Sequence, residues 1–391
     1  MSSASSGNVF VGVHRIGVVL CVLTFTLIVW GGHVNTTRSG MAFPDWPTSN
    51  LAPMVTYAPS EWLWQSDRFW EHGHRLLASV VGAVTVLLGL AIMRSVPREA
   101  RPSAGTIVLL GSVLLVIATA IVGMNAMPGG VMEAFMVLLA VLLVAFLVRS
   151  LRQQGHRRLV GLAISAFLAV CLQGAFGGYT VRNNLPDWTS TTHGMLAQFF
   201  FMMVLGITLL TSNRWQQAQR VIVERANTLR GIVTITWVLT IVQFFLGALT
   251  RHTDAWGVSV SWPHWDDSSF FPASHLLHHA QVAIHLLHRT LAYVVAAMIV
   301  VQWVHVFRHR AVVSAIVLPT TVNAMLVLVQ IGLGASILWT ARGELATTLH
   351  VAVGVLLLVL NSVTMFTTNR LYAGSSIPAS GGSVIAQQGS L

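Results

Sequence analysis

This chain repeats one pattern, QGAFG at 173–177 and QIGLG at 330–334, and in each copy a histidine follows sixteen positions after the last glycine, at His193 and His350. Both pentapeptides close a long apolar run, and each histidine begins the next run. A further pair, Gln243 and Gly247, has the same step of four, which places glutamine and glycine on one helix face. The repeat indicates a duplicated helical module with one equivalent histidine in each copy.

The composition excludes a soluble protein. Of 391 residues, 54% are hydrophobic and only 9% are charged, too few charges to cover a soluble fold of this size. Apolar runs of about 20 residues recur, the length that crosses a hydrocarbon core. We therefore predict an all-α polytopic membrane protein with about ten spans. The predicted spans are roughly 14–33, 74–94, 105–124, 130–149, 158–179, 193–212, 230–250, 285–307, 311–340 and 347–368.

The positively charged residues are concentrated on alternate loops. The chain has no lysine, and fifteen of its 22 basic residues, all arginines, lie on alternate loops and helix ends. The positive-inside rule predicts that this side, with both termini, faces the cytoplasm. The arginines do not form the patch that nucleic acid binding needs, so no nucleic-acid partner is expected. On the opposite side, two long loops rich in Trp and Pro, 34–70 and 251–284, are predicted to fold over the helix ends as lids. The two cysteines, Cys21 and Cys171, fall inside apolar runs, which disfavours a disulfide.

Two further histidines mark the internal duplication. His74 and His288 are each followed by arginine, at Arg75 and Arg289. The spacing from His74 to His193 exceeds that from His288 to His350 by 57 positions, about one helical hairpin. We therefore predict two pseudosymmetric four-helix bundles with a two-helix insertion at about 105–149. The expected segments are a cytoplasmic N-terminus (1–13), an N-terminal bundle (14–212), a linker (213–229), a C-terminal bundle (230–368) and a disordered tail (369–391).

The four histidines suggest haem. Each is predicted to open a helix that descends from the outer side, so all four would lie at a similar depth. Imidazole is a common axial ligand of haem iron, and two histidines on facing helices make a bis-histidine site. The alternative is that each histidine is an ordinary hydrogen-bonded or interfacial residue. Four matched positions in a duplicated module favour the haem interpretation. His285, one turn from His288, is an alternative ligand.

The residues beside these histidines differ between the copies. Glu71 lies one turn before His74 on the same face, where a carboxylate could accept protons next to the iron, or could pair with Arg75 at i,i+4. The second copy has no carboxylate there. Arg75 and Arg289 could bind haem propionates, or could form salt bridges or interfacial contacts. The asymmetry suggests that one copy carries out chemistry and the other holds a cofactor.

At these residues the chain resembles the haem A synthase family. The resemblance rests on GGHVNTTRSG at 31–40, PDWP at 44–47 and EHGHR at 71–75, with the Gln-x-x-x-Gly helix ends and the outer histidines. It covers nearly the whole chain except the inserted hairpin and the tail. Two departures stand out: family members usually have eight spans, and some carry a cysteine pair in the first outer loop that is absent here.

The resemblance implies a bacterial cytoplasmic membrane enzyme that oxidises the C8 methyl group of haem O to the formyl group of haem A. By position, His74 and His193 would flank the substrate haem O, with Glu71 as the essential acid. His288 and His350 would ligate a b-type haem that transfers electrons. The implied partners are haem O synthase and the terminal oxidase or its assembly factors, within membrane lipid; a homo-oligomer is left open.

Two other functional classes also use such residues. One is a bis-histidine cytochrome b-type electron-transfer protein, which is expected to place haems toward both membrane faces. The other is a haem chaperone or transporter, in which Glu71 would have no chemical task. Because all four histidines are expected toward one face, we favour the enzyme.

Overall fold

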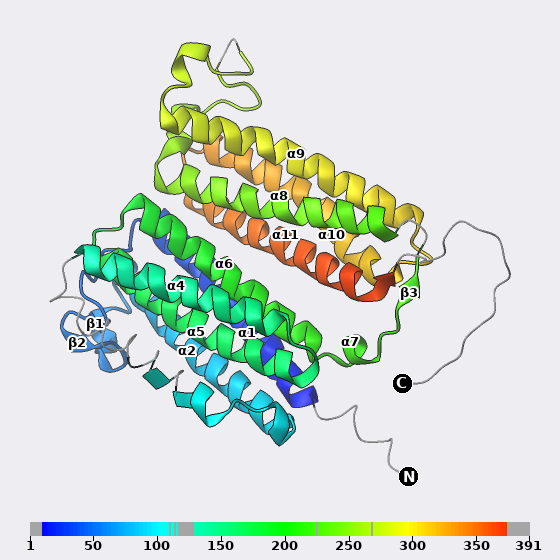
Figure 1. Ribbon diagram of the computed structural model, residues 1–391. Helices are drawn as coiled ribbons and strands as arrows, with labels where there is room; N and C mark the ends of the chain where they lie inside the picture. Colours follow the sequence, from blue (N-terminus) through cyan, green and yellow to red (C-terminus); the bar gives the residue numbers. More distant parts are fainter. Residues whose placement is uncertain are drawn as a thin grey trace.

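The computed structural model describes residues 10–373, except 109–110, 113–114, 116–128, 224–225 and 267–268. This part of the chain is almost entirely helical, which confirms the predicted all-α class (Figure 1). The helices are α1 (Val11–Thr36), α2 (Ser66–Ser95), α4 (Gly129–Leu151), α5 (Gly155–Arg182), α6 (Asp187–Leu210), α7 (Asn213–Gln217), α8 (Ala226–His252), α9 (Ala280–Arg308), α10 (Ser314–Trp339) and α11 (Glu344–Leu371). Two small sheets pair β1 (Thr48–Ser49) with β2 (Ala52–Pro53), and β3 (Val221–Ile222) with β4 (Tyr372–Ala373).

Eight of the described helices are long and apolar enough to cross a membrane, namely α1, α2, α5, α6, α8, α9, α10 and α11. They coincide with eight of the ten predicted spans. Helix α4 lies at the predicted span 130–149, whereas the predicted span 105–124 falls mostly outside the described residues. Helix α10 starts at Ser314, later than its apolar run, and contains Pro319 in its second turn.

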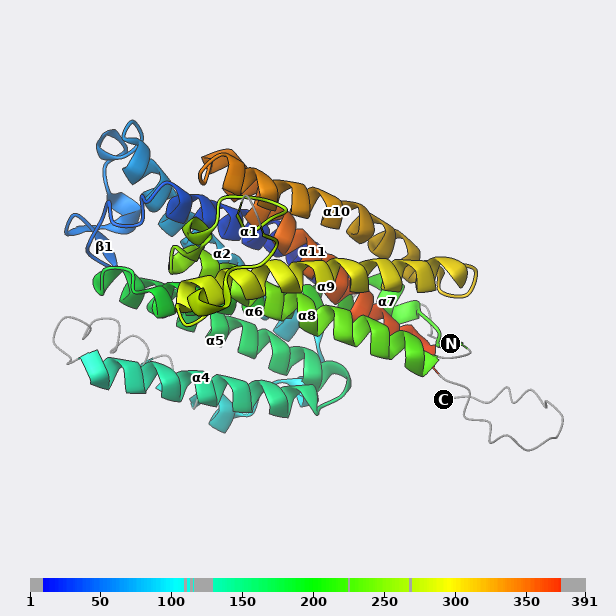
Figure 2. The ribbon, with the colours of Figure 1, turned by 90° about the horizontal axis from the view of Figure 1, so that it is seen from above.

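The long helices form two rings of four. In the first ring α1 packs on α2, α2 on α5, α5 on α6, and α6 returns to α1. The second ring repeats this order with α8, α9, α10 and α11, and the rings meet where α11 contacts α1 and α6, and α8 contacts α6 (Figures 1 and 2). Helices α2 and α6 are therefore diagonal across the first ring, as α9 and α11 are across the second.

Helix α4 lies outside the first ring, against α5 (Figure 2). In α5, 72% of the most apolar 18-residue segment is buried within the protein, whereas the figure is 22% for the equivalent helix α10. The outward surface of α5 in the first ring is thus covered by α4, whereas the equivalent surface of α10 in the second ring is open to lipid. Cys171, on α5, and Cys21, on α1, are free thiols, as predicted.

Helices α1, α5, α8 and α10 share one termination, at the end of the molecule that is predicted to face outward. A residue in the left-handed conformation lies seven positions after Gly31, Gly177, Gly247 and Gly334, at Arg38, Asn184, Asp254 and Ala341. In three of the four cases the next backbone N–H reaches back five residues to a carbonyl, the bond that closes a Schellman motif. The same register in both rings supports a one-to-one equivalence of positions, with offsets of 216 for α1 and α8 and 157 for α5 and α10.

The prediction that each histidine opens its helix is wrong by about two turns. His74 and His288 lie eight positions after the starts of α2 and α9, and His193 and His350 lie six positions after the starts of α6 and α11. That is about 9–12 Å along the axis. Hydropathy marks only the apolar part of a helix, and the outer turns here are polar and aromatic. The histidines therefore lie inside the rings, below the rim.

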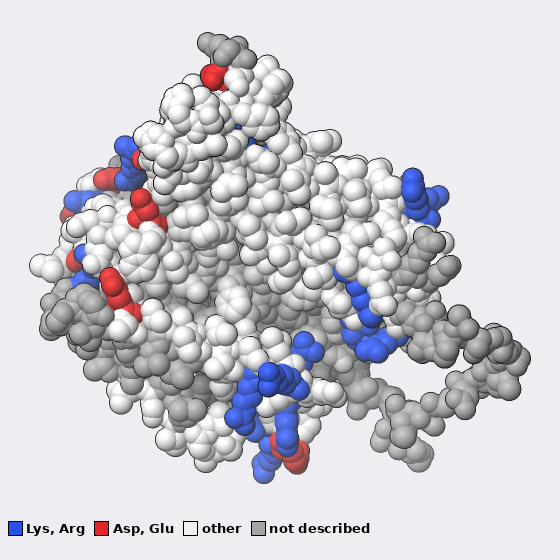
Figure 3. Space-filling view, turned by 45° about the horizontal axis from the view of Figure 1, so that its top comes forward, with Lys and Arg blue, Asp and Glu red and all other residues white. Residues whose placement is uncertain are grey.

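The opposite helix ends carry the basic residues. Arginines occupy the last turns of α2, α4, α9 and α11. Figure 3 shows most basic side chains toward one end and most acidic ones toward the other, with a broad uncharged belt between them. At the basic end, α11 continues to Leu371 and Tyr372–Ala373 pairs with β3, so the disorder predicted from residue 369 is wrong for 369–373. Residues 374–391 lie outside the described part.

Candidate haem-binding sites

Each of the four predicted histidines packs the edge of its imidazole against a glycine on a neighbouring helix. A Cβ atom at that glycine would collide with the ring or touch it closely. The distances from such a Cβ to Cε1 of the ring are 2.7 Å for Gly31 and His74, 2.8 Å for Gly177 and His193, 3.0 Å for Gly247 and His288, and 3.2 Å for Gly334 and His350. The repeated glycine is therefore a seat for the repeated histidine, because any larger residue would displace the ring.

The histidines form one pair in each ring. His74 on α2 and His193 on α6 come from diagonal helices and interact electrostatically. His288 on α9 and His350 on α11 do the same in the second ring. Two imidazoles that approach across a bundle from diagonal helices match the arrangement of a bis-histidine haem site.

Glutamines of the repeat hold two of these histidine-bearing helices. The side-chain amide of Gln173 donates to the carbonyl oxygen of His193 at 2.9 Å. The amide of Gln243 donates to the carbonyl oxygen of His288 at 3.0 Å and also lies 3.1 Å from Nδ1 of that ring. Each glutamine thus links the helix that carries the glycine seat to the helix that carries the ligand.

The third glutamine fixes the ring of His350, whereas His74 has no such partner. Nδ1 of His350 lies 3.1 Å from the carbonyl oxygen of Gln330, to which it donates. This tautomer leaves the lone pair on Nε2, the form that binds iron, and the side-chain amide of Gln330 donates to that Nε2 at 3.3 Å. At the equivalent position beside His74 the chain has Leu27, and the buried Nδ1 of His74 has no hydrogen-bond partner. The ring orientation is therefore fixed at His350 but not at His74.

Glu71 is buried beside the first pair, with 3% of its surface exposed. Its Oε1 lies 2.5 Å from Nη2 of Arg75, and its Oε2 accepts a hydrogen bond from the backbone N–H of Phe43 at 2.9 Å. The i,i+4 ion pair foreseen as one alternative is thus present. The carboxylate is also one turn from His74 on the same helix, so a role in proton transfer stays a prediction.

Arg75 is anchored to the first outer loop. Its guanidinium donates to the carbonyl oxygens of Phe43 at 2.7 Å, Asp45 at 2.8 Å and Thr48 at 2.9 Å. The same loop places Trp46 against Gly178 of α5, where a Cβ would lie 2.3 Å from the indole ring. The loop therefore packs on the first ring, as expected of a lid. These bonds favour the structural alternative for Arg75; the propionate role stays a prediction.

Arg289 repeats this arrangement in the second ring. It donates to the carbonyl oxygens of Pro263 at 3.0 Å and His264 at 2.9 Å, and to Oγ of Ser259 at 3.1 Å. All three acceptors belong to the second outer loop. The shared His-Arg pair thus combines a candidate ligand with a loop anchor in both copies, and the predicted contact of Arg289 with a propionate remains untested.

His285 occupies the position of Glu71 in the second copy, three residues before the candidate ligand. It is buried, and its ring lies 5.4 Å from that of Trp265. The glycine seat on α8 contacts His288 and not His285. This geometry favours His288 as the ligand and leaves the second ring without a carboxylate at this point.

The residues present fit a haem. Within the described part of the chain, no group of three or more His, Cys, Asp or Glu side chains is placed to hold a bare metal ion. Each ring instead offers two imidazoles on opposite sides of the bundle, each backed by a glycine. Such a pair suits a metal whose other ligands come from a planar macrocycle.

Two groups of residues in this region were missed by sequence reasoning. Arg251, in the last turn of α8, donates to Oδ1 of Asn35 at 2.5 Å and also to the carbonyl oxygen of Gly32 on α1. In the core of the second ring, Nδ2 of Asn323 donates to Oδ1 of Asn361 at 2.9 Å. The available signal was the rarity of buried cations and amides in membrane helices, which makes each a candidate functional residue.

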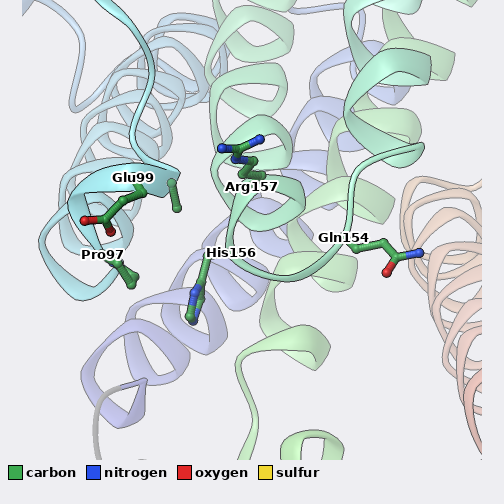
Figure 4. A pocket seen from close by; sticks show the side chains of 6 residues that line it. Pro97, Glu99, Gln154, His156 and Arg157 are labelled. Carbon is green, nitrogen blue, oxygen red and sulfur yellow. The ribbon is translucent and has the colours of Figure 1, made fainter.

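A shallow pocket lies at the other end of the first ring (Figure 4). It is lined by Pro97, Glu99, Ala100, Gln154, His156 and Arg157. These residues follow the last turn of α2 or precede and begin α5, whereas the candidate ligands lie toward the opposite helix ends. The pocket therefore belongs to neither histidine pair.

Comparison with known proteins identifies the family. Residues 129–362 match the family described as cytochrome oxidase assembly protein. The chain is 24% identical to a haem A synthase of Rhizorhabdus wittichii over 374 residues, which cover 87% of this chain and 89% of that protein. It is 26% identical to a haem A synthase of a Caulobacter species over 379 residues, which cover 86% and 88%. A haem A synthase of Geobacillus thermodenitrificans is 27% identical over 208 residues, which cover 52% and 63%.

Proposed function

Because this chain belongs to the cytochrome oxidase assembly protein family, we propose that it is a haem A synthase, an oxidoreductase that converts the C8 methyl group of haem O to the formyl group of haem A. The observation that supports this proposal most is that the two histidine sites are equivalent in position but differ in the residue one turn before the first histidine. Glu71 stands one turn from His74 in the first ring, and His285 stands in its place in the second.

The first ring is the proposed site of the reaction. His74 and His193 would hold the substrate haem O, and Glu71 would accept protons as hydrogen leaves the methyl carbon. Arg75 holds this carboxylate in place through the ion pair, and the backbone N–H of Phe43 binds its second oxygen. A buried carboxylate with a fixed orientation is suited to proton transfer at one defined position.

The second ring is the proposed site of a resident b-type haem. His288 and His350 would be its axial ligands, and such a haem supplies one-electron transfer. The hydrogen bond from Nδ1 of His350 to the carbonyl oxygen of Gln330 supports this assignment, because it fixes the ring with Nε2 free of a proton, as suits a ligand of a group that stays bound. The unfixed ring of His74 suits a group that enters and leaves.

The membrane context is part of the proposal. We place the protein in a bacterial cytoplasmic membrane with both termini in the cytoplasm and the histidines toward the outer face, following the arginine distribution. Haem O synthase as the source of substrate, and a terminal oxidase or its assembly factors as recipients, are the proposed partners. The long apolar helices would lie directly in lipid.

Haem extraction tests this function. Membranes that contain this chain together with haem O synthase are expected to yield hydroxylated and formylated haem, separated by chromatography and identified by mass. Glu71→Gln is expected to lose these products while its b-type haem content stays unchanged. Glu61→Gln, which alters an exposed carboxylate in the first outer loop, is the matched control. Absence of oxidised haem from the wild-type chain, with Glu71→Gln indistinguishable from it, refutes the proposal.

A further inference from the structure

A cluster of three arginines lies at the outer end of the interface between the two rings. Arg251 belongs to α8, Arg342 to the α10–α11 connection and Arg38 to the loop that follows α1. Nε of Arg251 and Nη2 of Arg342 both donate to Oδ1 of Asn35, at 2.5 Å and 3.3 Å, and Arg342 also interacts electrostatically with Arg38. Cations this close repel one another, so the arrangement calls for a compensating anion.

The anion that the chain itself supplies is weak. Arg342 pairs with Asp254 at 3.3 Å, but 60% of the Asp254 side chain is exposed, so the pair is strongly screened by water. Burial lowers the pKa of Arg342 from its ordinary value, with Arg38 acting in the same direction and Asp254 opposing them. The three guanidinium groups and one carboxylate leave two positive charges uncompensated within the described cluster.

Arg251 in particular has neutral partners. Its Nε donates to Oδ1 of Asn35 at 2.5 Å, and its Nη2 donates to Oγ1 of Thr36 at 2.7 Å and to the carbonyl oxygen of Gly32. All three acceptors are uncharged groups on α1. A guanidinium held in place in this way keeps its charge for a further ligand.

The position of Arg251 points to one ligand. Gln243, Gly247 and Arg251 succeed one another at steps of four on one face of α8, so Arg251 lies one turn, about 6 Å, outward of the seat of His288. Arg251 also interacts electrostatically with His350, the other candidate ligand of the second ring. It therefore stands at the outer rim of that haem site.

The equivalent positions in the first ring carry no charge. The repeat offsets relate Arg251 to Asn35, and Arg342 to Leu185. Arg251 and Arg342 thus have no charged counterparts in the first ring, and both belong to the ring assigned to a resident group. Arg38, on the first ring, adds its charge from across the interface.

We propose that Arg251 and Arg342 form a carboxylate-binding site for the propionates of the haem ligated by His288 and His350. Two propionates carry the two negative charges that the cluster lacks, and a guanidinium binds a carboxylate through parallel hydrogen bonds. This assignment rests on the proposed function in one respect only, that the second ring holds a haem. It replaces Arg75 and Arg289 as the principal propionate partners, because the hydrogen bonds of those two residues go to loop acceptors and to Glu71.

Redox titration of the purified protein tests the proposal. A nearby positive charge favours the reduced haem, so Arg251→Gln and Arg342→Gln are expected to lower the midpoint potential of the b-type haem. Asp254→Asn removes the one opposing carboxylate and is expected to raise it. Arg251→Gln is also expected to retain haem about tenfold less tightly, and Arg251→Lys to recover the potential in part. Arg182→Gln, at the outer end of α5, is the control.

Several outcomes overturn the proposal. An unchanged potential and haem content in Arg251→Gln contradicts it, as does a shift of equal size in Arg182→Gln. A downward shift in Asp254→Asn assigns the cluster a structural role instead. Loss of bound haem O with intact b-type haem moves the site to the first ring, and loss of co-purifying phospholipid alone identifies a lipid phosphate as the ligand.

The design remains decisive if one variant fails to fold. Should Arg251→Gln not accumulate, Arg342→Gln and Asp254→Asn, both altered in loop residues, still predict shifts of opposite sign. Failure of the proposed function is distinguishable, because it is measured as absence of oxidised haem from the wild-type chain. The potential of the b-type haem does not depend on that product.

Discussion

The two rings share a fold but differ in the core beneath their histidines. Positions related by the repeat are apolar in the first ring and polar in the second. The pairs are Leu88 and Gln302, Ala166 and Asn323, Val204 and Asn361, with threonine conserved between the copies at Thr24 and Thr240. All eight side chains are buried. The same backbone arrangement is thus held by apolar packing in one half and by amide hydrogen bonds in the other.

The amide network joins all four helices of the second ring. Asn361 on α11 accepts hydrogen bonds from Asn323 at 2.9 Å and Gln302 at 3.4 Å, and it donates to Oγ1 of Thr240 at 3.0 Å. Such bonds fix the register of helices that lipid alone would not order. A ring with fixed register suits a permanently bound cofactor, whereas apolar packing permits the small adjustments that substrate exchange requires.

The glycine seats predict the largest difference between the two rings. A Cβ at Gly177 would lie 2.8 Å from the ring of His193, whereas at the equivalent Gly334 it would lie 3.2 Å from that of His350. Gly177→Ala is therefore expected to displace its histidine and abolish most haem oxidation. Gly334→Ala should retain most of its b-type haem. Haem extraction and the low-spin haem signal in electron paramagnetic resonance measure the two effects, and equal damage from both variants would refute the ranking.

The amide network predicts an intermediate effect. Asn361→Val removes the hub and leaves buried amides unpaired, which should destabilise the protein by about 1–3 kcal/mol. The triple variant Gln302→Leu, Asn323→Ala and Asn361→Val copies the first ring and removes the partners together, so it should recover much of that loss. Thermal unfolding in detergent compares them. A triple variant less stable than Asn361→Val would contradict the view that apolar packing can replace the amide hydrogen bonds in the core of the second ring.

The smallest predicted effect is the pH response of the first outer loop. Partial burial of Asp45 opposes its ionisation, but bonds from Thr48 and from the backbone N–H groups of Leu51 and Asn50 outweigh it and lower the pKa of the carboxyl below 3.8. A depressed pKa stabilises the folded loop above 3.8, and this contribution is lost as the pH falls through the lower, folded value. Proteolysis of the loop by an acid-active protease should therefore increase over that range. Asp45→Asn should remove the dependence, and an unchanged profile in this variant would count against it.

Much of the fold could be predicted from sequence, because hydropathy and a repeated spacing are local signals. They identified the spans coincident with eight described helices and equated His74 with His288 and His193 with His350. Helix starts were not predictable in this way. The outer turns of α2 and α9 are polar and aromatic, so the apolar run begins well after the helix, and the depth of the histidines was underestimated by about two turns.

The side-chain partners depended on contacts between distant segments. That Arg75 and Arg289 lie next to candidate ligands was evident, but their loop acceptors are known only once the loops are folded. Arg251 was overlooked because its partners lie on α1, about 216 positions earlier in the chain. Its equivalence to Asn35 follows from the repeat, yet only the packed rings show the two side chains in contact.

In the proposed function the second ring holds a resident haem, whereas the first ring binds the substrate. The most direct test is the haem content of the equivalent variants His193→Ala and His350→Ala, purified from cells that make b-type haem but no haem O. We predict that His350→Ala loses its b-type haem in a pyridine haemochrome spectrum and that His193→Ala retains it. Equal loss of b-type haem from both variants, or loss from His193→Ala alone, would contradict the assignment of the resident haem to the second ring.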